Sequence, residues 1–308
     1  MVRVLRSPVD TLSCALFPAS CCACGSPLLR FSAVPVCDSC WNSLKIYPQA
    51  CCSLCGEDVC GSAFSAGAQA EKRFCDVCTK APPPFRRAVA FGAYRGILRS
   101  LIHALKYDGM LPLADGLGAL LAQSILSLQG EAPRELIVVP VPLHASKRNL
   151  KRFNHAELLA RAALRELSKA MPGKAMPGWK LTLDTRLLER QRATDSQAGL
   201  TPHQRRVNVR GAFLAPHPEL LRDAHILLID DIYTTGATAR ACTRALLTAG
   251  AASVRVATVA RAQFEHITRH QLARLESEAR PEPAREELAM EEDVAFWDVS
   301  TKAGPLIH

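Results

Sequence analysis

Two adjacent carboxylates, Asp230 and Asp231, stand between a short apolar run and a turn that is rich in threonine and glycine. The turn consists of Thr234, Thr235, Gly236, Ala237 and Thr238. Hydroxyl and backbone N–H groups in such a turn can donate to a phosphate, and glycine lets the backbone approach it closely. The carboxylates can accept hydrogen bonds from vicinal ribose hydroxyls. The combination predicts a site for a ribose 5-phosphate, which acids that merely end a strand and cap a helix would not explain.

Other phosphate-binding motifs do not fit this turn. A Walker-type loop requires Gly-Lys-Ser/Thr, and a dinucleotide-binding turn requires three glycines at fixed spacing. Neither pattern occurs between Asp230 and Thr238.

A basic segment offers a second contact for phosphates. The apolar run 136–143 predicts a buried strand that leads into Lys147, Arg148, Lys151 and Arg152. Cations at a strand end can hold a pyrophosphate, and Arg148 and Arg152 are the candidates for this role. Arg190 joins them, because it opens a polar, aperiodic segment that could close over a charged ligand. The alternative is a basic loop exposed to solvent.

Twelve of the thirteen cysteines lie in the first 78 residues. Eight of them form pairs separated by two residues: Cys21 and Cys24, Cys37 and Cys40, Cys52 and Cys55, Cys75 and Cys78. Two such turns complete a tetrahedral zinc site, so the pairs predict two structural zinc ions. The pairs can combine sequentially or in a crossed order, and a disulfide scaffold is the alternative to metal. Cys22 and Cys51 break the spacing and are expected not to be ligands, and Cys242 is expected to be a small core residue.

Secondary structure must bring these groups together. A strand at 226–229, a helix from Ala239 to Gly250 and a strand at 253–259 predict a parallel, right-handed strand-helix-strand unit. Ligands of such units lie at the carboxyl end of the strand, beside the N-terminus of the helix. Asn154 is expected to cap a second helix. Residues 94–107 predict an amphipathic helix, on which we expect His103 and Lys106 to face solvent.

Composition limits the class of protein. No apolar run approaches the roughly 18 residues that a membrane span needs, and Pro8 and Asp10 interrupt any secretory signal, so we expect a cytoplasmic protein. Residues 262–308 hold ten Asp/Glu and five Lys/Arg, which leaves a net charge of +14 on the residues before them. Such a surplus attracts phosphates and nucleic acids, although a solvated basic surface is the alternative.

The ordered set of features resembles the ComF family, also called ComF/GntX, whose members join double zinc ribbons to a type I phosphoribosyltransferase domain. The resemblance covers roughly residues 10–261. It rests on the four cysteine pairs, Leu105-Lys-Tyr107, Pro140-Val-Pro-Leu143, Arg152-Phe-Asn154, Thr194 with Gln197, Asn208-Val209 and the turn from Asp230 to Thr238. Family members commonly have Gly before the aromatic residue and Gln after the Asn, whereas this chain reads Arg152-Phe-Asn-His155.

The resemblance implies an α/β fold: a type I phosphoribosyltransferase-like parallel sheet flanked by helices, with a small zinc-ribbon module at the N-terminus. The expected division is a ribbon module at 10–80, a phosphoribosyltransferase-like domain at 81–261 and a mobile charged tail at 262–308. The implied ligand is phosphoribosyl pyrophosphate or a related ribose 5-phosphate bound with magnesium, and the implied setting is DNA uptake in natural competence. If the protein is a pentosyl transferase, Asp230, Asp231 and Arg152 are its catalytic candidates. The alternative is a non-catalytic protein of the uptake machinery that binds single-stranded DNA or docks on a partner helicase or uptake complex.

Overall fold

The computed structural model describes residues 19–28, 34–46, 51–59, 73–144, 153–169, 179–192 and 202–262. These residues belong to one compact unit, Met1–Gln263, and residues 264–308, nearly all of the expected tail, lie outside the described residues. Within the described ranges, no helix is long and apolar enough to cross a membrane.

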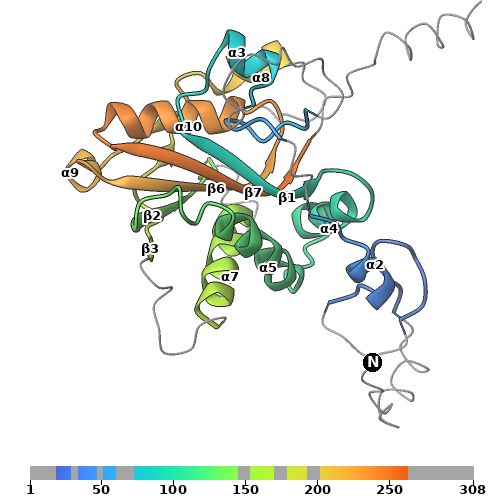
Figure 1. Cartoon of the computed structure of the whole chain (residues 1–308). Coiled ribbons are helices and arrows are strands. Elements are labelled where there is room, and N and C mark those ends of the chain that lie inside the picture. The colour runs from blue at the N-terminus through green and yellow to red at the C-terminus, as the bar shows by residue number, and fades with distance from the viewer. Residues whose placement is uncertain are drawn as a thin grey trace, which may run out of the picture. The chain divides into compact units, whose positions relative to one another are not determined.

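This unit alternates helices and strands (Figure 1). Its helices are α2 (Asp38–Asn42), α3 (Asp76–Lys80), α4 (Gly96–Tyr107), α5 (Leu113–Leu126), α7 (His155–Lys169), α8 (Pro202–Val209), α9 (Pro218–Leu221) and α10 (Ala237–Thr248). Its strands are β1 (Arg87–Ala93), β2 (Glu135–Pro140), β3 (Lys180–Leu183), β4 (Glu189–Arg190), β5 (Phe213–Leu214), β6 (His225–Tyr233) and β7 (Ser253–Arg261).

Five parallel strands form the central sheet in the order β1-β7-β6-β2-β3. Figure 1 shows α10 on one face of this sheet and α5 and α7 on the other. Because both faces are covered, the central strands can be apolar throughout, and the side chains from Ile226 to Ile229 are fully buried. This is the predicted phosphoribosyltransferase-like α/β architecture.

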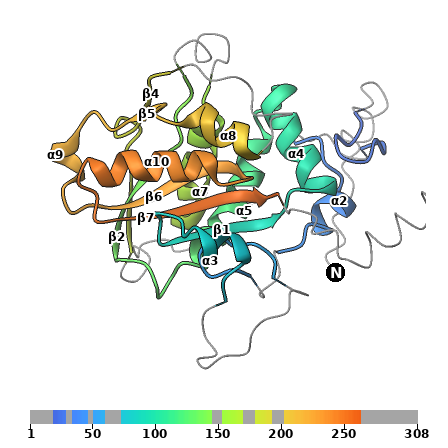
Figure 2. The same ribbon diagram turned by 90° about the horizontal axis from the view of Figure 1, so that it is seen from above.

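The connections diverge between β2 and β6, which are neighbours in the sheet. The helix after β2 is α7 and the helix after β6 is α10, and the two cover opposite faces (Figures 1 and 2). The strand that follows α7 is β3, on the outer side of β2, whereas the strand that follows α10 is β7, on the far side of β6. Such a divergence is a topological switch point, the place where open α/β sheets bind ligands.

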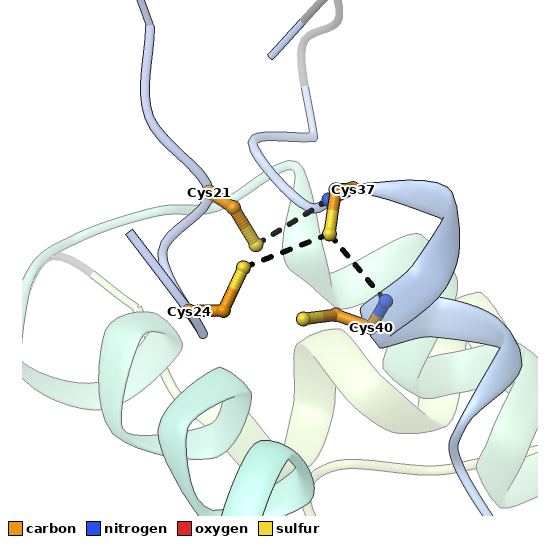
Figure 3. A group of neighbouring side chains, drawn as sticks. All are labelled: Cys21, Cys24, Cys37 and Cys40. Atoms are coloured by element: carbon orange, nitrogen blue, oxygen red, sulfur yellow. Dashed lines mark hydrogen bonds between the residues drawn. The ribbon is translucent and has the colours of Figure 1, made fainter. Parts of the chain in front are cut away.

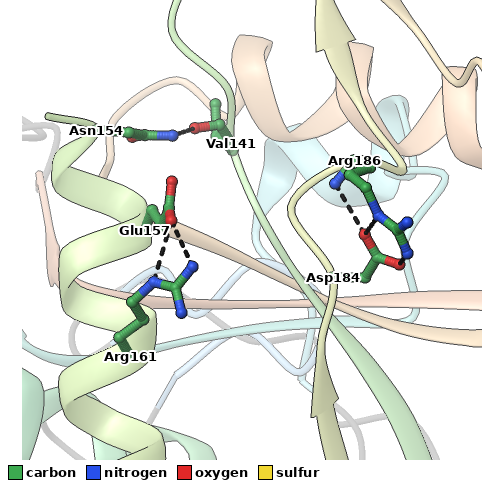
Figure 4. Close-up of polar contacts among 6 residues, drawn as sticks. All are labelled: Val141, Asn154, Glu157, Arg161, Asp184 and Arg186. Carbon is green, nitrogen blue, oxygen red and sulfur yellow. Dashed lines mark hydrogen bonds and ion pairs between the residues drawn. The ribbon is translucent and has the colours of Figure 1, made fainter.

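Asn154 ties the start of α7 to the end of β2, as predicted from its capping ability. Its side-chain oxygen accepts from the Ala156 amide at 3.1 Å, and its side-chain nitrogen donates to the Val141 carbonyl at 3.0 Å (Figure 4). One turn further along the helix, Glu157 and Arg161 form an exposed ion pair. The cap therefore sets where α7 begins beside the switch point.

Near the end of β3, Asp184 accepts from both the backbone and the guanidinium of Arg186 (Figure 4). The guanidinium and the backbone N–H of Arg186 hold the pKa of Asp184 below its usual value despite some opposing burial. This local pair stabilises the turn that leaves the edge strand.

Candidate functional site

The acid pair lies inside β6 rather than after it. The pairing of β6 with β2 ends at Pro140 and Ile229, whereas its pairing with β7 continues to Tyr233 and Arg261. The expectation that the strand ends at residue 229 is therefore wrong, because one neighbouring strand still supports the chain beyond that point. Asp230 and Asp231 occupy the stretch that β7 supports alone, next to the switch point.

Lys106 contacts the acid pair, although the sequence placed it in solvent. Its ammonium lies 2.7 Å from the Asp231 carboxylate, and its side chain is only 20% exposed. Burial lowers the pKa of Lys106, but the charges of Asp231 and Asp230 outweigh this effect and leave the pKa raised. The prediction of a solvent-facing Lys106 is wrong because its ammonium pairs with the Asp231 carboxylate of β6. His103, one turn earlier, is exposed as expected.

Asp230 has a strongly altered acidity. Burial, and secondly the charge of Asp231, raise its pKa to about 7, while Lys106 acts in the opposite direction. The Asp230 side chain also accepts from the Asp231 amide at 2.9 Å. Two adjacent carboxylates with one ammonium leave a net negative charge that a divalent cation or hydroxyl donors would satisfy.

The predicted turn joins β6 to α10. Gly236 adopts a left-handed backbone with φ of +72° and directly precedes the helix. Thr235 accepts from the Ala237 amide at 3.3 Å through its hydroxyl, and Thr234 and Thr238 are partly exposed. The first N–H groups of a helix lack intrahelical acceptors, so the turn and the N-terminus of α10 form an arrangement suited to a phosphate.

The structure brings Arg190 toward the same region, on β4 rather than in an aperiodic loop. Its guanidinium lies 5.4 Å from the centre of the Phe213 ring. Burial lowers the pKa of Arg190, and the nearby charge of Asp230 opposes this shift. The other pyrophosphate candidates, Arg148 and Arg152, lie outside the described residues.

The eight paired cysteines form two groups of four, and the grouping is sequential. Within each group the four sulfur atoms lie within 4.8 Å of one another: Cys21, Cys24, Cys37 and Cys40 in the first centre, Cys52, Cys55, Cys75 and Cys78 in the second. Figure 3 shows the four sulfur atoms of the first centre pointing toward a common point.

Sulfur separations test whether these centres fit a metal. They are 3.7 Å between Cys24 and Cys37 and 3.6 Å between Cys55 and Cys75. Tetrahedral zinc with Zn–S bonds of about 2.3 Å separates its sulfurs by about 3.8 Å, whereas a disulfide requires about 2.05 Å. Every described cysteine is a free thiol, so the geometry fits a metal ion held by four thiolates and excludes disulfides at these pairs.

Backbone amides support the thiolate form. Cys21 accepts from the Cys37 amide at 3.4 Å. Burial acts to raise the pKa of Cys21, but the amides of Cys37, Ala23 and Cys24 lower it to about 6. Gly25 and Gly56, each next to a pair, have φ of +74° and +69°, as expected for zinc knuckles.

The remaining described cysteines are not part of either centre. Cys22 and Cys51 fall outside the two groups, in agreement with their predicted exclusion. Cys242 is fully buried on α10, as predicted for a core residue. Cys14 and Cys60 lie outside the described residues.

Sequence reasoning missed three polar residues near the site: Lys106, Glu57 and Arg261. Lys106 belongs to the Leu-Lys-Tyr triplet that contributes to the family resemblance, which was the available signal. Arg261 ends β7, and its guanidinium forms a buried ion pair with Glu57, two residues after Cys55. No short-range pattern connects Glu57 to Arg261, because only tertiary folding brings them together.

Comparison with known proteins agrees with this architecture. The family model described as phosphoribosyl transferase domain matches residues 157–277. DNA utilization protein YhgH of Escherichia coli K12 is 31% identical over 184 residues, which cover 59% of this chain and 75% of that protein. YhgH of Salmonella typhimurium is 28% identical, with 78% and 95% of the two chains covered. Competence protein F of Haemophilus influenzae is 27% identical, with 74% and 90% covered.

Solved structures add little. The hypoxanthine-guanine phosphoribosyltransferase of Schistosoma mansoni in complex with IMP overlaps 49% of this chain and 56% of its own at 15% identity, with a TM-score of 0.28. An overlap this small carries no argument about function. The assignment therefore rests on the sequence relatives, the matched domain and the two cysteine centres, which together show that the chain belongs to the ComF family.

Proposed function

We propose that this protein binds phosphoribosyl pyrophosphate, or a closely related ribose 5-phosphate, at the turn between β6 and α10. The observation that carries the proposal is the placement of the Asp230–Asp231 pair and a glycine-containing helix N-terminus side by side at a topological switch point. The acids supply acceptors for ribose hydroxyls, and the turn supplies donors for the 5-phosphate. No other described segment combines these two features.

Lys106 has a defined role in this proposal. Without a ligand, its ammonium neutralises part of the acid pair and holds the Asp231 carboxylate in place. An ordered carboxylate binds a sugar with less loss of side-chain entropy than a mobile one. The positive charge of Arg190 lowers the pKa of Asp230, and we expect its guanidinium to contact the pyrophosphate of the ligand.

Two of the proposed contacts, Arg148 and Arg152, follow β2 in the sequence. The β2 and β6 strands are parallel neighbours, so the segment after β2 begins at the same edge of the sheet as the turn after β6. A pyrophosphate on the anomeric carbon would extend from the β6 turn toward that segment.

The donor set also fits magnesium, since Asp230 and Asp231 offer the carboxylate oxygens that hard cations prefer. A bound magnesium ion would neutralise the pyrophosphate as it leaves. If the protein is a pentosyl transferase, Asp230 and Asp231 hold the ribose while positive groups stabilise the charge that develops on the leaving pyrophosphate.

Calorimetric titration with magnesium and phosphoribosyl pyrophosphate tests the proposal. Wild type should bind with a Kd on the order of 1 to 100 µM. The double variant D230N/D231N should lose about 100-fold or more in affinity, because two charge-assisted contacts are removed. D115N is the matched control, since Asp115 is an exposed acid of α5 paired with Arg165. Absence of binding by folded, zinc-loaded wild type would contradict the proposal.

A second candidate function is non-catalytic binding of single-stranded DNA during uptake, with or without docking on a helicase or uptake complex. The surplus of basic residues before position 262 favours it. The aromatic content of 6% offers few stacking platforms for bases. DNA affinity that falls steeply with salt, and that persists in D230N/D231N, would support this function over the first.

A further inference from the structure

The second cysteine centre is joined to the body of the protein by a buried arginine. Arg261, at the end of β7, is 3% exposed, and its partner Glu57 is 5% exposed. The Arg261 Nε donates to the Glu57 carboxylate at 3.1 Å, and a terminal nitrogen lies 3.6 Å from the sulfur of Cys55. Glu57 in turn belongs to the cysteine turn, because its carbonyl accepts from the Cys52 amide at 2.7 Å.

The same arginine packs on a residue that shapes the phosphate turn. Its guanidinium lies 4.4 Å from the centre of the Tyr233 ring, and Phe85 contacts that ring edge-on at 6.2 Å. Tyr233 is the last residue of β6 and lies directly against Gly236. A Cβ atom at Gly236 would come within 2.1 Å of the Tyr233 hydroxyl oxygen. The position of this ring therefore determines the space in which the turn can lie.

A second contact joins the same two regions. Arg240, in the first turn of α10, donates to the carbonyls of Ala81 and Pro82 at 2.8 and 3.1 Å. These residues follow α3, the helix that carries Cys78. The Arg240 amide also donates to the Gly236 carbonyl at 2.8 Å. The cysteine centre thus contacts both sides of the turn, through Tyr233 before Gly236 and through α10 after it.

The first cysteine centre packs elsewhere. Trp41 of α2 lies against Gly116 of α5, where a Cβ would meet its ring at 2.4 Å. Ile97 of α4 packs against the cluster that contains Cys21 and Cys40. These contacts place the first centre on α4 and α5, which cover the opposite face of the sheet from α10.

We infer that Arg261 and Glu57 are positioning residues for the phosphate turn: they transmit the folded state of the second cysteine centre to Tyr233, and Tyr233 holds Gly236 in its left-handed conformation. One consequence of the inference is that ribose 5-phosphate binding depends on the second centre, and this consequence rests on the proposed function. Its structural part stands on the Arg261–Glu57–Tyr233 contacts alone.

Hydrogen exchange without ligand tests the structural part. R261M removes the ion pair and the ring contact, and E57Q keeps the shape and the acceptor but removes the charge. Amides 234–240 should exchange about tenfold faster or more in R261M, and by a smaller factor in E57Q, while zinc content and far-UV circular dichroism stay those of wild type. R255M is the control, because Arg255 lies on the same strand but donates to the Glu131 carbonyl at its other end.

Affinity for phosphoribosyl pyrophosphate in the presence of magnesium tests the consequence. It should fall by more than tenfold in R261M and by about tenfold in E57Q, and it should remain unchanged in R255M. If wild type does not bind phosphoribosyl pyrophosphate, the proposed function fails, and the exchange data still decide the inference. Should R261M not fold, E57Q carries the test, since the isosteric amide retains the hydrogen bond. Unchanged exchange of amides 234–240 in the folded variants would overturn the inference.

Discussion

The two cysteine centres have the same local design but belong to different parts of the protein. In each, the third cysteine precedes a short helix as its N-cap residue and the fourth lies within that helix: Cys37 and Cys40 with α2, Cys75 and Cys78 with α3. In each, a glycine with positive φ follows the first pair. A zinc-ribbon pattern therefore predicts the geometry of both centres equally well.

Their surroundings differ. The first centre has an exposed member, Cys24, and forms a small cluster of its own with Leu28. The second centre is part of the large core under α10, and the Ala88 amide of β1 donates to the Leu54 carbonyl within it. The metal-ligand pattern specifies the local geometry of each centre, whereas the surrounding contacts decide whether a centre also contacts the turn between β6 and α10.

Replacing one matched cysteine in each centre should give the largest difference. Cys78 and Cys40 are both buried and both hold the fourth position. C78S should lower the free energy of unfolding by about 4 kcal/mol or more, because it opens a centre inside the main core. C40S should cost the main transition no more than about 1 kcal/mol. Urea unfolding followed by far-UV circular dichroism, with zinc determined in each sample, measures the free energy of unfolding of both variants. Equal losses of stability in the two variants would contradict the difference between the centres.

Substitution of Lys106 probes α4, the helix that lies between the first centre and the acid pair. This helix contacts the first centre through Ile97 and the acid pair through Lys106. K106M should destabilise the protein by about 3 kcal/mol by leaving the Asp231 carboxylate buried without its ammonium. The zinc content should equal that of wild type. K180M is the control, since the exposed pair of Lys180 and Glu135 contributes about 0.5 kcal/mol or less. Equal urea midpoints for the two variants would show that the ion pair of Lys106 and Asp231 contributes no more stability than the exposed pair of Lys180 and Glu135.

Substitution of Gly236 probes the turn between β6 and α10. G236A should destabilise the protein by about 2 kcal/mol, since φ is positive and Tyr233 fills the space for a Cβ. Gly211 has a similar φ of +63° with open space around it, so G211A carries the backbone cost alone, about 1 kcal/mol. Thermal unfolding compares the two, and a G236A effect no larger than that of G211A would show that the Tyr233 contact is unimportant.

The raised pKa of Asp230 makes the stability of the ligand-free protein depend on pH. Its pKa in the folded protein is raised to about 7, so the folded state binds more protons than the unfolded state between about pH 4 and pH 7. Stability of the ligand-free protein should therefore fall as pH rises through this window, by about 1 kcal/mol per pH unit at most. D230N should flatten the slope. Magnesium-dependent ligand binding should show the opposite trend and strengthen toward pH 7, because the ionised carboxylate is the binding form.

Short-range patterns account for what could be predicted. Three features are each encoded by residues close together in the sequence, and the structure contains all of them: the cysteine pairs, the Asp230–Thr238 turn and the parallel strand-helix-strand unit. The length of β6 could not be predicted, since it depends on β7 continuing to pair after β2 has ended.

The burial of Lys106 and the pairing of Glu57 with Arg261 also escaped prediction. Periodicity assigned Lys106 to the polar face of its helix, and only the fold shows that Asp231 covers part of that face. Buried charges of this kind persist where an opposite charge from a distant segment compensates them, and a single sequence does not reveal such a partner.

The central claim, that one cysteine centre supports a ribosyl phosphate site and the other does not, is tested most directly by calorimetric titration of magnesium and phosphoribosyl pyrophosphate into wild type, C40S and E57Q at known zinc content. We predict that C40S retains the wild-type Kd within about threefold, and that E57Q binds about tenfold more weakly with both zinc ions in place. Equal affinities for wild type and E57Q, or loss of binding in C40S alone, would contradict the claim.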